Sequence, residues 1–183
     1  MAQNLEALLQ ECTVKLTLAN GEVGTGFFVA PGYVLTCVHV VRNAGDEPIS
    51  LRWQQDPEFA QAQIEQLLPA YDLALLRFTP PREAHPCVML DADIQRRDEL
   101  DLFGYPERDY PDGRPAGFVC EGEFQEADLS LILLKQGQMQ PGMSGAALLN
   151  GRTGKVCAMA TLTRDQYTDL GGGGIKASVI LEQ

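Results

Sequence analysis

Short apolar runs separated by turn signals recur along almost the whole chain, and this pattern most constrains the fold. Typical runs are CTVKLTL at 12–18, VGTGFFVA at 23–30 and LSLILLK at 129–135. Asn-Gly, Pro-Gly and Asp-Gly pairs stand between such runs. Because many short strands at this spacing are typical of barrels and sandwiches, the sequence predicts an all-β fold.

Three segments depart from the strand pattern. Helical periodicity is clear only near the N-terminus, in AQNLEALLQE at 2–11. The segment DPEFAQAQIEQLL at 56–68 is compatible with a helix or with an alternating strand. The GGGG run at 171–174 precedes the strand-like IKASVIL, so we expect a mobile loop inside the domain.

The segment FTPPREAHPCVML, at 78–90, divides the strands into about six before it and six after it. Its prolines lack the N–H donor that a strand needs to continue a hydrogen-bonded ladder. We therefore expect a first barrel with a short N-terminal helix at 1–80, a connector at 81–90 and a second barrel at 91–183.

Charge and cysteine content restrict the partners and the compartment. A net charge of −11 disfavours nucleic acid and anionic lipid, although it is compatible with basic segments of a protein partner and also serves solubility. The apolar runs are too short to cross a bilayer, and the first residues do not resemble a signal peptide. Five scattered cysteines without a CxxC motif favour a reducing, cytoplasmic setting.

Few residues could carry chemistry. Ser144 lies between two glycines, Gly142 and Gly145, in QPGMSGAALLN, and a serine nucleophile needs a base, normally histidine. Of the two histidines, His85 is expected to be an exposed connector residue, whereas His39 ends the strand-like GYVLTCVHVV. Asp72 opens the apolar YDLALLRF. Taken singly, these residues are equally compatible with a tight hairpin, a structural histidine and a strand-edge charge.

Together, three segments resemble a known family. GTGFFVAPGYVLTCVHVV, YDLALLRF and QPGMSGAALLN resemble the signature segments of chymotrypsin-like (trypsin-like) serine peptidases, and the order His, Asp, Ser agrees with that family. The nearest resemblance is to the short, disulfide-free bacterial HtrA-like and effector-associated branch. It implies two six-stranded antiparallel Greek-key β-barrels with the active site in the cleft between them.

The resemblance assigns catalytic roles residue by residue. It implies that His39 is the general base, that Asp72 orients it and that Ser144 is the nucleophile. The backbone N–H groups of Gly142 and Ser144 would form the oxyanion hole. No cofactor is implied, and no metal site either, since the Cys37-x-His39 pair has no second ligand pair in the sequence.

The resemblance also implies six substrate-binding residues: Gln138, Thr161, Leu162, Thr163, Gly174 and Lys176. Thr161–Thr163 would pair with the substrate backbone. Gln138 would form the floor of the primary pocket, and its neutrality does not support selection of Arg or Lys. If Lys176 points into this pocket, the pocket should prefer an acidic substrate residue. If Lys176 points out of it, the pocket should prefer a small apolar substrate residue.

The predicted function is an intracellular serine endopeptidase acting on protein or peptide substrates. Met143 stands where secreted relatives have an aspartate that pairs with a cleaved N-terminus, so another element must hold the oxyanion loop. We expect this element to be a regulatory domain or partner outside this chain. Two alternatives stay open: a catalytically weak peptide-binding or scaffold domain, and an esterase using the same site.

Overall fold

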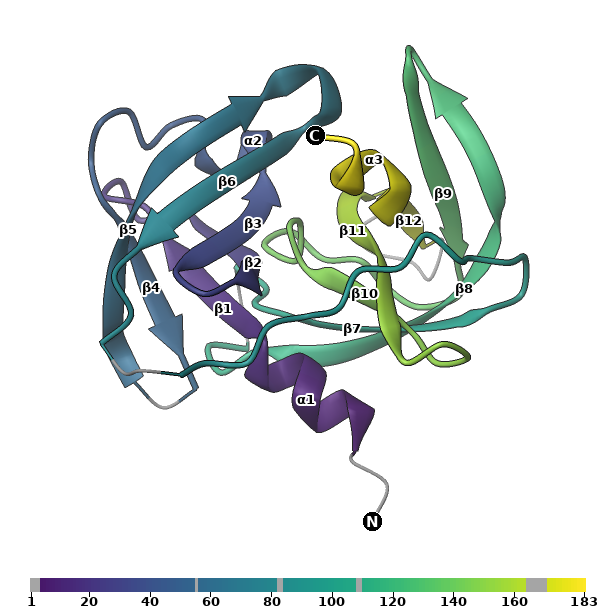
Figure 1. Cartoon of the computed structure of the whole chain (residues 1–183), viewed down its shortest axis with the longest axis horizontal. Coiled ribbons are helices and arrows are strands. Elements are labelled where there is room, and N and C mark those ends of the chain that lie inside the picture. The colour runs from purple at the N-terminus through teal and green to yellow at the C-terminus, as the bar shows by residue number, and fades with distance from the viewer. Residues whose placement is uncertain (1–3, 55, 82–83, 108–109, 164–170) are drawn as a thin grey trace.

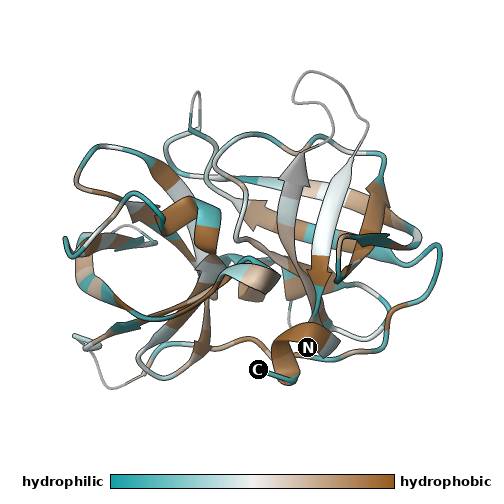
Figure 2. Cartoon of the chain, turned by 90° about the horizontal axis from the view of Figure 1, so that it is seen from above, coloured by the Kyte–Doolittle hydropathy of each residue, from teal (hydrophilic) through white to brown (hydrophobic). Residues whose placement is uncertain are grey.

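The computed structural model describes residues 4–54, 56–81, 84–107, 110–163 and 171–183. Two closed six-stranded antiparallel β-barrels lie side by side, as predicted (Figure 1). Hydrophobic residues gather on the strands, and hydrophilic residues on the connecting loops (Figure 2). Among the described residues, no helix is both long and apolar enough to span a membrane.

The first barrel has the strand order β1-β2-β3-β6-β5-β4, closed by pairing of β1 with β4. Its strands are β1 (Thr13–Thr17), β2 (Val23–Ala30), β3 (Tyr33–Cys37), β4 (Ile49–Trp53), β5 (Asp56–Leu68) and β6 (Leu73–Phe78). Helix α1 (Leu5–Glu11) precedes it, and Asn4 caps this helix by accepting from the Glu6 N–H. The ambiguous segment at 56–68 is therefore strand β5.

The second barrel repeats the arrangement, with the order β10-β11-β12-β9-β8-β7. Its strands are β7 (Glu99–Gly104), β8 (Arg114–Glu126), β9 (Leu129–Lys135), β10 (Ala147–Asn150), β11 (Lys155–Thr163) and β12 (Gly172–Lys176). Two of the expected strand runs end early. The run GYVLTCVHVV leaves β3 after Cys37 and forms the short helix α2 (Val38–Val41), and IKASVIL ends in helix α3 (Ala177–Leu181).

The glycine run is not a mobile loop, so that expectation is wrong. Gly172–Gly174 are buried in β12, which pairs with β9 on one side and β11 on the other. A Cβ on Gly174 would lie 2.9 Å from Leu148 Cδ1 and 3.2 Å from Ile132 Cγ1. The glycines thus allow a strand to pass close to core side chains, a demand that the sequence pattern does not distinguish from a flexible linker.

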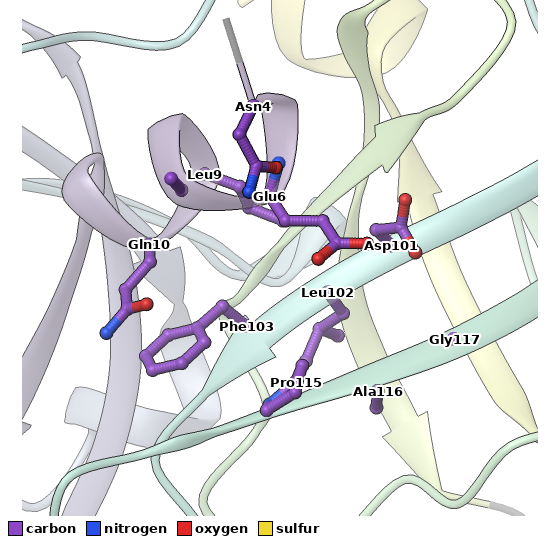
Figure 3. Close-up of a pocket in the computed structure, with 11 residues that line it drawn as sticks. Asn4, Glu6, Leu9, Gln10, Asp101, Leu102, Phe103, Pro115, Ala116 and Gly117 are labelled. Atoms are coloured by element: carbon purple, nitrogen blue, oxygen red, sulfur yellow. The ribbon is translucent and has the colours of Figure 1, made fainter.

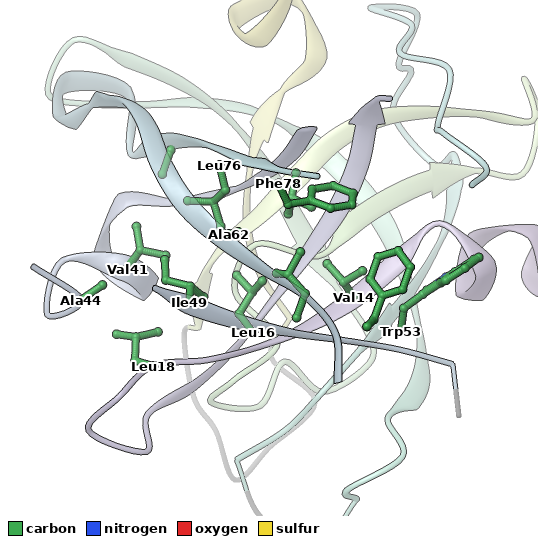
Figure 4. Packing of buried hydrophobic residues seen from close by; sticks show 14 of the residues in the cluster. Val14, Leu16, Leu18, Val41, Ala44, Ile49, Trp53, Ala62, Leu76 and Phe78 are labelled. Carbon is green, nitrogen blue, oxygen red and sulfur yellow. The ribbon is translucent and has the colours of Figure 1, made fainter. Parts of the chain in front are cut away.

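Each barrel has its own apolar core, and a third cluster joins them. The first core packs Leu16, Ile49 and Leu76 against a group of aromatic rings (Figure 4). His85 belongs with these rings and is not the exposed residue expected. Its ring lies 4.1 Å from that of Phe28, and its Nε2 accepts from a backbone N–H. The connector is therefore attached to the first barrel by a histidine whose ring packs at a tilt of 37° against Phe28.

A buried carboxylate joins the segment just before β7 to the turn between β10 and β11. Asp98 is 8% exposed and accepts hydrogen bonds from Arg152 Nε and Nη2, each at 2.9 Å. Asn150 Nδ2 donates to the same carboxylate at 2.7 Å, as does the Gln95 N–H at 2.9 Å. The hydrogen bonds from Arg152 contribute most to lowering the pKa of Asp98 to about 2, and those from the Gln95 N–H and Asn150 contribute less. Burial has the opposite effect and raises this pKa.

Candidate active site

His39 and Asp72 meet where α2 leaves β3 and where a short 3-10 turn, Pro69–Tyr71, leads into β6. His39 Nδ1 and Asp72 Oδ2 are 2.7 Å apart, and the His39 N–H donates to Asp72 Oδ1 at 3.0 Å. Asp72 has the left-handed backbone angle φ +52°. Strands β3 and β6 are paired neighbours, so the barrel itself brings these two residues together.

Thr161 of β11 adds a hydrogen bond that ties the second barrel to this pair. Its hydroxyl donates to Asp72 Oδ2 at 2.6 Å. Burial raises the pKa of Asp72, but the hydrogen bonds from His39 and Thr161 outweigh burial and leave the pKa below its ordinary value. Asp72 is therefore held ionised, which favours the His39 tautomer with its proton on Nδ1.

Ser144 lies in a turn that two glycines shape. Gly142 has φ +94° and Gly145 has φ +89°, a region that side-chain-bearing residues rarely adopt. A Cβ on Gly142 would lie 2.5 Å from the Tyr105 carbonyl oxygen. Within the described residues, the backbone N–H groups of Gly142 and Ser144 have no hydrogen-bond acceptor. Both N–H groups beside the Ser144 hydroxyl are thus available to an incoming oxygen.

Thr25, in strand β2 of the first barrel, holds this turn and was not predicted. Its hydroxyl donates to the Gly142 carbonyl at 2.7 Å and accepts from the Tyr105 N–H at 2.9 Å. Its N–H donates to the Ser144 carbonyl at 3.3 Å, and its own carbonyl accepts from Thr36 Oγ1 at 2.7 Å. One buried threonine therefore fixes the serine turn from the opposite barrel.

A family model of the trypsin-like peptidase domain matches residues 24–159, more than half of the chain. The chain belongs to the trypsin-like peptidases. No curated protein sequence gives a significant match to this peptidase.

Several solved structures share its fold at low sequence identity. The active form of the Rv3671c protease from M. tuberculosis superposes with a TM-score of 0.81 at 19% identity, over 98% of this chain and 82% of that one. Deg5 has the same TM-score and identity, over 98% and 90% of the two chains. The HtrA-type protease AlgW with decapeptide gives 0.81 at 17% identity, over 98% and 65%.

The loop of this peptidase that carries Met143 has its support inside the chain. Met143 is fully buried among the core residues of the second barrel, and its sulfur accepts from the Gln140 N–H at 3.5 Å. The Glu107 N–H donates to the Pro141 carbonyl at 2.9 Å. Together with the hydrogen bonds from Thr25, these contacts hold the oxyanion loop, for which the sequence suggested an element outside the chain. Regulation by a partner stays a prediction.

The Ser144 hydroxyl donates to the Thr161 carbonyl at 3.5 Å, and the described residues contain no hydrogen bond between Ser144 and His39. One potential metal-ligand atom from each of Cys37, His39 and Asp72 lies within 4.8 Å of the other two. A metal would need the Cys37 thiolate, but burial raises the pKa of this thiol well above its ordinary value, and Sγ lies 3.4 Å from the Ala160 carbonyl. These groups fit the hydrogen-bonded arrangement better than a metal site.

The structure brings part of the expected primary pocket together. Gln138 forms a parallel bridge with Gly171, which directly precedes β12, the strand that contains the buried Gly174. Lys176 Nζ pairs with Glu123 Oε1 at 2.7 Å, so its charge is engaged on the barrel surface. The residue preference at this pocket stays a prediction.

The segment expected to bind substrate lies at the end of β11, and its role stays a prediction. Leu162 pairs with Gly173 and Thr163 with Gly172. On the other side of β11, the last backbone hydrogen bonds within the described residues are those of Ala160 with Gly145 and Ala146. The backbone from Thr161 onward therefore has one edge that β10 does not occupy. The side chains of Leu162 and Thr163 lie outside the described residues.

A cavity of about 410 Å³ lies away from this site, between helix α1 and strands β7 and β8 (Figure 3). It shares no residue with the arrangement around Ser144. Glu6 and Asp101 make its lining acidic. Burial first, and then the charges of Glu6 and Glu99, raise the pKa of Asp101. Nothing in this cavity provides a nucleophile and base in contact.

Proposed function

We propose that this trypsin-like peptidase cleaves peptide bonds through an acyl-enzyme formed on Ser144, with His39 as the base and Asp72 as its orienting group. The observation that carries the proposal is the 2.7 Å contact between His39 Nδ1 and Asp72, next to a serine turn with two free N–H groups. An orienting carboxylate, a histidine and a serine in this relation are the elements of acyl transfer.

The steps follow from the geometry. The Ser144 hydroxyl turns from the Thr161 carbonyl to His39 Nε2 when substrate binds, since catalytic hydrogen bonds often tighten only in the complex. Oγ attacks the carbonyl carbon while its proton passes to His39. The N–H groups of Gly142 and Ser144 stabilise the oxyanion. His39 then protonates the leaving amine, and water hydrolyses the acyl-enzyme by the same route.

Labelling with a fluorophosphonate tests the nucleophile directly. We expect one adduct on Ser144 in the parent protein and none in Ser144→Ala. His39→Ala should lower turnover by orders of magnitude, because residues of such a unit fail together. Asp72→Asn should lower kcat by about 10⁴-fold with the fold intact. A His39→Ala protein as active as its parent would refute the assignment.

Labelling separates the scaffold alternative, and a comparison of ester with amide substrates separates the esterase alternative. The HtrA-type protease AlgW is described with a decapeptide, and peptide binding of this kind supports a peptide substrate here. A scaffold domain would bind peptides without labelling or turnover. An esterase would hydrolyse ester substrates and leave the matched amides intact, whereas we expect both to be cleaved.

We further propose an intracellular location, supported by five cysteines that are all free. A thiol count on protein unfolded without reductant should give five. A count of one or three would argue for disulfides and against a reducing compartment. Whether a domain or partner outside residues 1–183 raises the rate is tested by comparing turnover with and without it.

A further inference from the structure

A cavity of about 380 Å³ adjoins the active site and has no role in the chemistry described above. It shares Asp72 and Thr161 with that site. Pro69 and Ala70, from the turn before Asp72, form one side, and the tip of the β8–β9 hairpin at Glu126–Leu129 forms another. This hairpin rises at the edge of the second barrel (Figure 1). A ligand held at Ser144 can therefore extend into the cavity.

The lining combines apolar surface with two carboxylates. Pro69, Ala70, Leu129 and the buried Leu131 provide the apolar part, and Glu126 and Asp128 are exposed at the hairpin tip. Such a combination suits a side chain with a long methylene stem and a charged end, because the stem packs on apolar surface while the charge stays at the rim.

The two carboxylates have their charge available. On the same hairpin, Glu121 pairs with Lys135 at 3.8 Å and Glu123 with Lys176 at 2.7 Å. In the part of the chain that the structure describes, no ion pair involves Glu126 or Asp128. The hairpin therefore neutralises the acidic residues along its strands and leaves those at its tip for another cation.

The direction of a bound peptide follows from Thr161. A substrate that pairs with the free edge after Thr161 is extended, so its alternate side chains point to opposite sides. If the residue just before the scissile bond points to the pocket expected at Gln138 and Gly174, the second and fourth residues before the bond point to the opposite face of the peptide. The cavity shares Asp72 and Thr161 with the active site, so side chains on that face can reach it.

We propose that this cavity is a specificity subsite for a lysine or arginine located two or four residues before the scissile bond. The proposal rests on the proposed peptidase function. The stem of the basic side chain packs against Pro69, Ala70 and Leu131, and its cation pairs with Glu126 and Asp128. The net charge of −11 favours the approach of the same basic substrates.

Two readouts test the subsite. The first is kcat/KM for matched peptides with Lys, Gln or Glu at the second or fourth position before the scissile bond. The second is the Kd of the same peptides for Ser144→Ala, measured by fluorescence anisotropy, which does not need turnover. We expect about a two- to fivefold preference for Lys over Gln at one of these positions, the strength of exposed ion pairs.

Glu126→Gln/Asp128→Asn should remove this preference in both readouts, because it keeps the shape of the tip and removes its charge. The matched control is Glu6→Gln/Glu11→Gln on α1, which changes the net charge equally and should keep the preference. Loss in both double variants would mean that net charge alone selects the substrate, and the proposal would fail. It would also fail if the parent did not distinguish Lys from Gln.

Fluorophosphonate labelling separates this proposal from the proposed function. Labelling of Ser144 without a Lys preference would refute the subsite and leave the peptidase intact. A charge-dependent Lys preference in Kd without labelling would support the subsite and refute the catalytic assignment.

Discussion

Replacing Asp98 with asparagine tests the buried carboxylate that joins the segment before β7 to the β10–β11 turn. The side chain of Asp98 is buried, and it accepts four hydrogen bonds, two of them from Arg152. An asparagine keeps the size but loses the charge. It also presents an NH₂ group to donors such as Asn150 Nδ2. We expect Asp98→Asn to fold and to be clearly less stable than the parent at neutral pH.

The magnitude follows from the pKa of Asp98, which is lowered from 3.8 to about 2 in the folded protein. The unfolded chain has the ordinary value, so folding favours the ionised form. At about 1.36 kcal/mol per pH unit, this adds roughly 2.4 kcal/mol to the free energy of unfolding at neutral pH. The contribution is complete above about pH 4 and is lost as the pH falls through about 2.

Thermal unfolding at pH 7, 5 and 3.5 measures the effect. For a chain of this size, roughly 2.4 kcal/mol corresponds to a midpoint lower by about 5–10 °C. The gap between Asp98→Asn and the parent should be widest at pH 7 and should narrow below about pH 4.

Asp101→Asn is the control with the opposite sign. The pKa of Asp101 is raised in the folded protein, so its ionisation opposes folding at neutral pH. Removing its charge should raise the midpoint at pH 7. A midpoint for Asp98→Asn that stays within 1 °C of the parent (about 0.3 kcal/mol) at every pH would refute the reasoning.

Three further predictions concern the site and the glycine strand. Thr161→Val removes a donor to Asp72, so the pKa of Asp72 should rise and kcat/KM should fall about 10–100-fold; an unchanged kcat/KM would contradict this. Gly174→Ala should cost about 1–3 kcal/mol in chemical denaturation, while Gly117→Ala, whose Cβ would have no atom within 4 Å, should cost little. Thr25→Val should lower kcat more than it raises KM, and Thr25→Ser should restore much of the rate, whereas equal loss in both variants would point to packing alone.

The sequence was sufficient for the architecture because strand length, turn residues and the proline-rich break all depend on local chemistry. It also indicated which residues meet, but only through the resemblance of three segments to a known family, since His39 lies in α2 and Asp72 in the turn before β6. It could not identify Thr25, because a threonine inside a strand has no local signal for partners 80 and 117 positions away. Nor could it distinguish a packed glycine strand from a loop, since neighbours in space decide between them. His85 was misplaced for the same reason.

The bonds made by Thr25 have a consequence for recombination between relatives. Three of its four hydrogen-bonding partners, Gly142, Ser144 and Tyr105, lie beyond the connector. A chimera joined at the connector inherits Ser144 from one parent and Thr25, which holds the serine turn by hydrogen bonds, from the other. The two halves are therefore not interchangeable modules. We expect functional chimeras to be enriched for parents that share a hydroxyl-bearing residue at this strand position, however well each half folds.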